Sequence, residues 1–187
     1  MKLSTFARIQ TGVYAKTNPH GEWVYLQSRH FDESGNLREK LDTELLVDSK
    51  MSKHLLAEGD VLFMAKGSRN LASIFSGANI KAVPSSSYLV VRVLDQFKTQ
   101  IIPEYLQWFI NHPRTQERLR SHAKGSGIPS VTLADFAALE VPVPDIETQT
   151  RILAIAKLAT KERELLTLLG DLKSNDIDQK LLSKAKS

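Results

Sequence analysis

The segment from residue 125 to residue 169 constrains the fold most, because it places a loop, a short helix, a strand and a long helix directly after one another. Its first part, Gly-Ser-Gly-Ile-Pro at 125–129, is expected to be a loop, since glycine rotates freely and proline disfavours a helical residue before it. Thr132 then predicts the start of a short helix, because its hydroxyl can accept from a free backbone N–H and Asp135 stands where a capping partner belongs.

A strand and a long helix follow this loop. Leu-Glu-Val at 139–141 predicts a strand that Pro142 and Pro144 end, since proline cannot donate to a strand ladder. Asp145 is a favourable N-cap, and neither glycine nor proline occurs again before Gly170. A long helix is therefore expected from about Asp145.

The predicted long helix carries a narrow apolar seam at alternating three- and four-residue steps, interrupted once by Glu162. A seam of this kind suits a partner helix. Gly170 is expected to interrupt the helix, so that residues 172–187 form a second short helix or a frayed tail. The seam consists of Ile155, Leu158, Leu165, Leu169 and Leu172.

This order of elements resembles the end of a target recognition domain and the start of the conserved helix in type I restriction-modification specificity subunits. The residues that carry the resemblance are Val-Pro-Val-Pro-Asp-Ile-Glu-Thr-Gln at 141–149 and the helix that follows. A second match is Leu55 followed by Gly59-Asp60 and an apolar strand at 61–65. Full-length members of the family usually hold two recognition domains and two such helices. With one of each, this chain resembles a half-length form with a single target recognition domain.

Short apolar runs rich in β-branched and aromatic residues recur along the first half of the chain, separated by polar turns. A short turn or helix from Leu3 is expected to lead into a first strand that Gly12 ends. Spacings near ten residues favour a curved sheet or partly open barrel over a parallel α/β fold. Further strands are expected at 23–27, 45–47, 61–65, 71–75, 80–83 and 88–93, and helices at 103–111 and 113–123.

The predicted fold class is α+β. Residues 1–144 are expected to form the target recognition domain, a β-rich curved sheet or partly open barrel with flanking helices. Residues 145–187 are expected to form the conserved assembly helix and tail, with coiled-coil-like packing. A chain of 187 residues, 42% of them hydrophobic, can bury the core of one such domain and carry one appendage.

The location of the chain is predicted from features that it lacks. No run approaches the apolar length of a membrane span, and the first residues are too interrupted for a signal peptide. The sequence contains no cysteine, which excludes disulfides and thiolate metal sites. A cytoplasmic location is expected.

Charge is unevenly distributed although the net charge is only +4. Acidic residues concentrate in 32–60, and none occurs between Asp60 and Asp95. That acid-free stretch holds Lys66, Arg69, Lys81 and Arg92. One face of the molecule is therefore expected to be basic, as a nucleic-acid binder requires.

DNA contact is expected from polar side chains, chiefly in the Gly-Ser-Arg-Asn loop after the 61–65 strand, because arginine and asparagine can pair with base edges. Each candidate taken alone is equally well explained as an ordinary solvated side chain. Trp23 and Trp108 are expected in the core rather than as stacking platforms. The candidates in the loop are Lys66, Ser68, Arg69 and Asn70, and those elsewhere are Lys16, Arg29, Lys81, Ser86, Lys124 and Ser126.

Enzymatic alternatives have less support. A methyltransferase would need a glycine-rich cofactor loop after a strand and an Asn/Asp-Pro-Pro-aromatic loop, and the sequence has neither. A nuclease centre of Asp32, Asp48 and Lys50 stays open, because two carboxylates can hold Mg²⁺ and a lysine can help to activate water. The histidines show no spacing typical of metal ligands, so no metal and no cofactor are predicted.

The resemblance implies a non-catalytic subunit that binds one half-site of double-stranded DNA. It would seat methyltransferase subunits, which bring S-adenosylmethionine, and possibly a motor-nuclease subunit. A stand-alone DNA-binding or regulatory protein that dimerises through its helix remains the alternative.

A homodimer joined by antiparallel helices would have twofold symmetry and would read an inverted repeat. A helix from Asp145 to Leu169 would be about 37 Å long, which predicts half-sites about one DNA turn apart.

Overall fold

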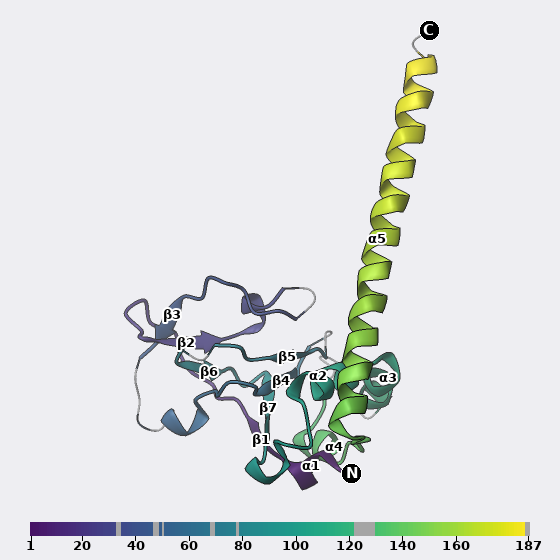
Figure 1. Ribbon diagram of the computed structural model, residues 1–187. Coiled ribbons are helices and arrows are strands. Elements are labelled where there is room, and N and C mark those ends of the chain that lie inside the picture. Colours follow the sequence, from purple (N-terminus) through teal and green to yellow (C-terminus); the bar gives the residue numbers. More distant parts are fainter. Residues whose placement is uncertain are drawn as a thin grey trace. The chain divides into compact units, whose positions relative to one another are not determined.

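The computed structural model describes residues 1–32, 35–46, 49, 51–67, 70–77, 79–121 and 130–185. The chain divides into two compact units, Met1–Gln149 and Thr150–Ser187. The first unit contains two β-sheets and four α-helices, and the second consists of the long helix α5 beyond its first turn (Figure 1). The predicted boundary between residues 144 and 145 stays a prediction.

The larger sheet has the strand order β1-β7-β4-β5 and is antiparallel throughout. Its central strands β4 and β7 each have a strand on either side, and β4 is a continuous apolar run. Val61, Leu62 and Phe63 of β4 are fully buried. The strands are β1 (Ala7–Thr11), β4 (Val61–Met64), β5 (Ala72–Ile74) and β7 (Tyr88–Val93).

The smaller sheet has the order β3-β2-β6, in which β2 pairs antiparallel with β3 and parallel with β6. The α+β prediction is confirmed, but the strands form two sheets that do not close into a barrel, instead of one curved sheet. The chain joins the sheets at Gly12, whose N–H donates to the Tyr88 carbonyl, and at Val13, whose N–H donates to the Pro84 carbonyl, both at 2.9 Å. The strands are β2 (Trp23–Leu26), β3 (Thr43–Leu45) and β6 (Ala82–Pro84).

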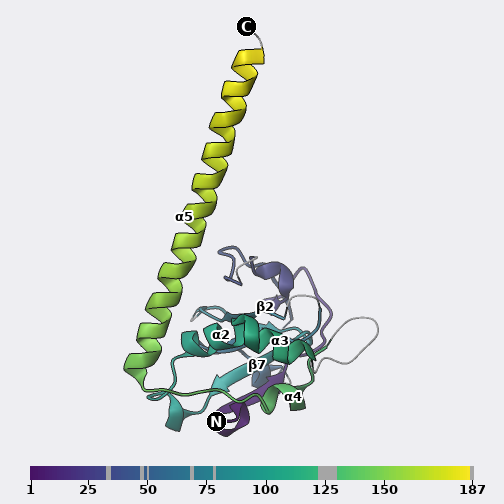
Figure 2. The same cartoon turned by 90° about the vertical axis from the view of Figure 1, so that its right-hand side faces the viewer.

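Helices α2 (Pro103–Asn111) and α3 (Pro113–Ser121) begin with proline, as the sequence predicts. The Asn111 side chain holds α2 against β5, accepting from the Ala72 N–H and donating to its carbonyl, both at 2.8 Å. Figure 2 shows the two helices in front of β7. They cover one side of the larger sheet.

Helix α4 (Leu133–Ala137) begins at the predicted cap, because the Thr132 hydroxyl accepts from the Asp135 N–H at 3.1 Å. Its Phe136 ring stacks on Phe63 of β4 at 4.3 Å between ring centroids. The following extended residues 139–141 pair with the first residues of the chain, just before α1 (Leu3–Phe6). The beginning of the first unit is therefore joined to a segment near its end.

The predicted Gly-Asp turn positions a buried ion pair. Gly59 has φ +81°, which favours glycine, and Asp60 beside it is almost fully buried. Both Asp60 carboxylate oxygens accept from Arg92, at 2.7 and 2.6 Å, and one also accepts from the Ala57 N–H at 2.8 Å. Hydrogen bonding to Asp60 raises the pKa of Arg92. Arg92 is thus neutralised by Asp60 and does not supply free charge to a basic face.

Helix α5 (Ile146–Ala185) starts at the predicted N-cap, where the Asp145 carboxylate accepts from the Thr148 N–H at 2.7 Å. The predicted interruption at Gly170 is wrong, because the helix is continuous for 40 residues. One glycine costs a helix only about 1 kcal/mol relative to alanine, and no proline follows. Every member of the predicted seam is exposed, between 48% and 70%.

Several local features differ from the sequence prediction. The strand expected at 45–47 lies earlier, at Thr43–Leu45, and three short 3₁₀ turns were not predicted. In the part of the chain that the structure describes, no helix is long and apolar enough to cross a membrane. The 3₁₀ turns are η1 (Ser28–His30), η2 (Ser52–His54) and η3 (Asp95–Phe97).

Candidate nucleic-acid interface

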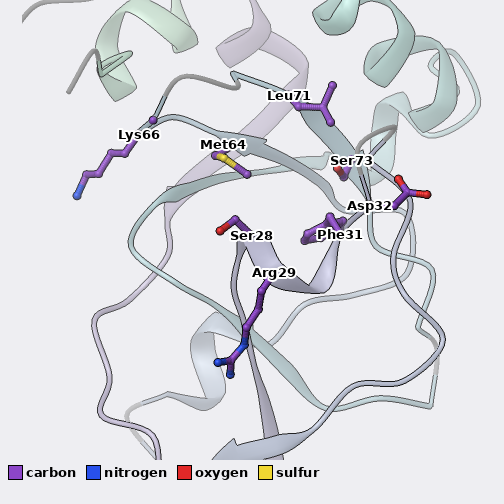
Figure 3. Close-up of a pocket in the computed structure, with 9 residues that line it drawn as sticks. Ser28, Arg29, Phe31, Asp32, Met64, Lys66, Leu71 and Ser73 are labelled. Carbon is purple, nitrogen blue, oxygen red and sulfur yellow. The ribbon is translucent and has the colours of Figure 1, made fainter.

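Two neighbouring hollows open on the first unit and share Ser28 and Arg29 of η1. The first, here called the Phe31 hollow, has a volume of about 390 Å³. In Figure 3 the apolar side chains lie between η1 and the strands, and the charged ends of Arg29 and Lys66 extend away from them. The Phe31 hollow is lined by Ser28, Arg29, Phe31, Asp32, Met64, Lys66, Gly67, Leu71 and Ser73.

The second hollow, here called the serine hollow, has a volume of about 430 Å³ and is more polar. One wall is the turn between β6 and β7, which is closed by the Tyr88 N–H donating to the Ser85 carbonyl at 3.0 Å. The hollow is lined by Tyr14, Ala15, Tyr25, Gln27, Ser28, Arg29, Ser85, Ser86 and Ser87.

Arg29 is held at the edge of both hollows by the geometry of η1. The Gln27 N–H donates to Nδ1 of the buried His30 at 3.0 Å, which fixes the turn and leaves Arg29 exposed. The Arg29 guanidinium forms an ion pair with Glu44 of β3. Burial, followed by the charge of Arg29, lowers the pKa of His30, and Glu44 and Asp42 oppose this more weakly.

Lys66 lies where β4 ends. Its backbone N–H contacts the Ser87 carbonyl at 3.4 Å, and its backbone bridges to Ser130. The end of β4, the serine turn and the residue after the predicted glycine loop therefore meet at one place. Four predicted DNA contacts lie outside the described residues: Ser68, Arg69, Lys124 and Ser126.

The other predicted contacts are only partly brought together. Ser86 is half-buried in the wall of the serine hollow, and Lys16 is exposed directly after Ala15 of its rim. Lys81 is exposed beside β6 and lines neither hollow. The hollows thus gather Arg29, Lys66 and Ser86, with Lys16 adjacent.

Asn70 does not present its amide to solvent. Its side chain is 4% exposed and donates to the Met64 carbonyl at 3.1 Å. This bond joins Asn70 to the end of β4, and it gives the buried amide the internal partner that such a group needs. Asn70 is therefore not placed to make the expected base contact.

Three lining serines were missed as candidates, namely Ser28, Ser85 and Ser87. The Pro-Ser-Ser-Ser run at 84–87 was visible in the sequence as a turn between strands. Only the folded chain shows that η1 lies opposite this turn, since these segments are distant in sequence.

The structure gives little support to the alternatives to DNA contact. Asp32 holds its own turn by accepting from the Asn36 backbone N–H at 2.8 Å and from its amide at 2.9 Å. The other members of the nuclease hypothesis, Asp48 and Lys50, lie outside the described residues. Across the described ranges, no three histidine or acidic side chains are placed to hold a metal ion.

The two tryptophans are placed in different ways. Trp23 is buried in the core beside the smaller sheet, as predicted. Trp108 is half-buried against Tyr105, with ring centroids 5.6 Å apart.

The family of the type I restriction modification DNA specificity domain matches residues 33–167, which is most of the chain. The chain belongs to this family. The match includes the lining residues of both hollows from Met64 onward and continues into α5, whereas the lining residues before residue 33, Arg29 and Phe31 among them, lie outside it. No curated protein matches the sequence.

Solved structures with the same fold come from specificity subunits. The chain is 15% identical to the type I restriction-modification S subunit from M. genitalium, with a TM-score of 0.58. The aligned part covers 89% of this chain and 40% of the M. genitalium subunit. The HsdS subunit from Thermoanaerobacter tengcongensis is 14% identical, with a TM-score of 0.59, over 87% of this chain and 37% of that one. A structure described as the basis of complex assembly and conformational transition of the type I R-M system gives a TM-score of 0.65 at 15% identity, over 89% and 39%. The specificity-domain chain thus spans about two fifths of these neighbours.

Proposed function

We propose that this chain is a DNA-recognition module of a type I restriction-modification system and binds one half-site of double-stranded DNA. The family match over residues 33–167 is the observation that carries the proposal. The exposed cations Arg29 and Lys66 around the two hollows support it, because phosphate contacts supply most of the affinity of DNA-binding proteins.

The chain itself performs no chemistry in this proposal. It seats methyltransferase subunits, which bring S-adenosylmethionine, and a motor-nuclease subunit is a further candidate partner. This function implies a cytoplasmic location, where the DNA is. Co-purification of a methyltransferase with the tagged chain is the expected result, and a chain that binds DNA but recovers no methyltransferase would favour a stand-alone regulator.

Assembly is proposed to occur through α5. Its apolar seam is exposed along the second unit, and exposed apolar stripes usually mark interaction sites. A pair of antiparallel helices gives twofold symmetry, so the target should be an inverted repeat with an unread spacer. The estimate of one DNA turn between half-sites used a helix ending at Leu169. Because α5 reaches Ala185, the helix is about 60 Å long, and half-sites one DNA turn apart are no longer expected.

Selection of duplexes from a randomised pool by the purified chain tests the proposed function. The expected result is enrichment of one short sequence and its inverted copy. Failure to enrich any sequence at moderate salt, with the chain folded by circular dichroism, would remove the proposal.

A further inference from the structure

We propose that the serine hollow binds one phosphate group of the DNA backbone, and that Arg29 reaches this phosphate by leaving Glu44. This inference rests on the proposed function and assigns a chemical role to one part of the interface. It separates the serine hollow, which positions DNA, from surfaces that read base edges.

Hydroxyl groups supply the donors of this site. Ser28 comes from η1 and Ser85, Ser86 and Ser87 from the turn before β7. Ser85 is only 7% exposed, and among the residues with described positions none of the four hydroxyls has a hydrogen-bond partner. The Ser85 hydroxyl is not a buried atom without a partner, so it is open to the hollow, and the four hydroxyls are available to donate to a phosphate oxygen.

The Tyr25 hydroxyl in the same hollow has a different role. It donates to the Val13 carbonyl at 2.9 Å and accepts from the Ala15 N–H at 3.2 Å. These bonds hold residues 13–15 as the opposite rim. The serine hydroxyls are therefore the ones left for a ligand.

Charge favours an anion in this hollow. Among the residues that the structure describes, no aspartate or glutamate lines it, and Arg29 stands at its edge. Arg29 is paired with Glu44, and the two side chains are 53% and 24% exposed. Its Nε also lies 3.3 Å from His30 Nε2. An ion pair this exposed is weak and favours the bound form by only about two- to fivefold. A phosphate that also accepts from serine hydroxyls can therefore replace Glu44.

Two further cations flank the site. Lys66 is joined through its backbone to Ser87, and Lys16 directly follows Ala15. Both are exposed, and neither forms an ion pair within the described part of the chain. They attract the DNA strand to the hollow without occupying it. The Phe31 hollow on the other side of η1 has apolar walls and suits a sugar or base instead.

The experiment measures DNA affinity against salt concentration for the full chain and its variants. Arg29→Ala should lower affinity roughly tenfold for every sequence and reduce the slope of log affinity against log salt by about 0.9, the value for one phosphate. Glu44→Gln should raise affinity by about two- to fivefold, because it releases Arg29. The double variant Ser86→Ala, Ser87→Ala should weaken binding with the slope unchanged.

Lys98→Ala is the matched control. Lys98 is exposed and paired with Asp95 at 2.7 Å, beyond the opposite end of β7 from the serines. The substitution Lys98→Ala removes the same charge as Arg29→Ala and should leave both the DNA affinity and the salt slope unchanged. Melting curves verify that each variant is folded.

The outcomes distinguish a failure of the phosphate site from a failure of the proposed function. If the unaltered chain binds no DNA, the proposed function fails and the phosphate site fails with it. If the unaltered chain binds but Arg29→Ala keeps the full slope, or relaxes one base position, only the phosphate site is overturned. Displacement of DNA by inorganic phosphate beyond that by chloride of equal ionic strength, lost in Arg29→Ala, would support the site. Binding of inorganic phosphate that is lost in Arg29→Ala while DNA affinity and slope are kept would assign the hollow to free phosphate and overturn the DNA assignment.

Discussion

The side-chain carbonyl of Gln149 accepts from the backbone N–H of Ile102 at 3.0 Å, joining the first turn of α5 to the loop before α2. The Gln149 amide also donates to the carbonyls of Gln100 and Pro144, both at 2.7 Å, and the residue is 0% exposed. One buried amide thus satisfies three backbone groups where the recognition unit ends.

Replacing Gln149 by leucine should destabilise the recognition unit. The change leaves the Ile102 N–H buried without an acceptor, which costs about 1–3 kcal/mol of unfolding free energy. Urea unfolding measures the difference. Gln179→Leu, the same change at an exposed position further along α5, is the control and should change stability little. Equal unfolding midpoints for Gln149→Leu and the unaltered chain would show that the buried amide is not needed.

The capped helices and the Gly-Asp turn were predictable because each rests on residues close together in the sequence. The local sequence predicts both structures directly, through Thr132 with Asp135 for the helix cap and Gly59 with Asp60 for the turn. The parallel pairing of β2 with β6 was not predictable, since pairing between distant strands leaves no local pattern. For the same reason the role of Gln149 was not predictable, since its partners Gln100 and Ile102 lie almost fifty residues away.

The candidate site was only partly predictable. Arg29, Lys66 and Ser86 were chosen as polar residues after strands or in turns, and the fold brings them to neighbouring hollows. Asn70 fitted the same sequence pattern but is buried, because sequence does not show which side of a turn faces inward. Glycine at 170 suggested a helix end, yet the surrounding helix formers outweigh its small penalty.

Gly12→Ala should destabilise the chain strongly. A Cβ atom at Gly12 would lie 2.1 Å from the Ser85 carbonyl oxygen and 2.5 Å from that of Pro84, so the junction of the two sheets would have to open. A loss of more than about 3 kcal/mol is expected, since overpacking against backbone cannot relax easily.

Gly170→Ala is the opposite case. Nothing lies within 4 Å of a Cβ atom there, so alanine should stabilise α5 by about 0.5–1 kcal/mol. Thermal melting monitored by circular dichroism checks both substitutions. Comparable effects at the two glycines would contradict the close approach at Gly12.

Acid should reduce stability through His30. Burial lowers its pKa below the ordinary value of 6.5, so the unfolded chain takes up a proton more readily than the folded chain. Stability is therefore full above about pH 6.5 and falls as the pH drops below this value. Burial also lowers the pKa of His54, which acts in the same direction.

The substitution His30→Asn tests this pH dependence, because asparagine can still accept from the Gln27 N–H but does not titrate. Unfolding free energy measured from pH 7.5 to pH 5 should fall less in the variant than in the unaltered chain. Parallel curves would mean that His30 does not contribute to the loss.

Leu165→Asp should break assembly through α5 while the recognition unit stays folded. Leu165 is 54% exposed in the middle of the seam, and a charge there would face the partner helix. Leu182→Asp is the control, because Leu182 is similarly exposed but lies off the seam. Sedimentation velocity should show the smaller species only for Leu165→Asp. A monomer for the unaltered chain, with no partner recovered from cells, would argue against assembly by this helix.

DNA recognition is tested most directly by sequencing modified bases in the host genome with and without this gene. The account predicts a methylated inverted repeat with an unread spacer that disappears when the gene is deleted. A continuous or asymmetric site, with this chain as the sole specificity protein, would show that the symmetric pairing is wrong. An unchanged methylation pattern in cells that retain the methyltransferase would contradict the central claim that this chain selects the DNA target.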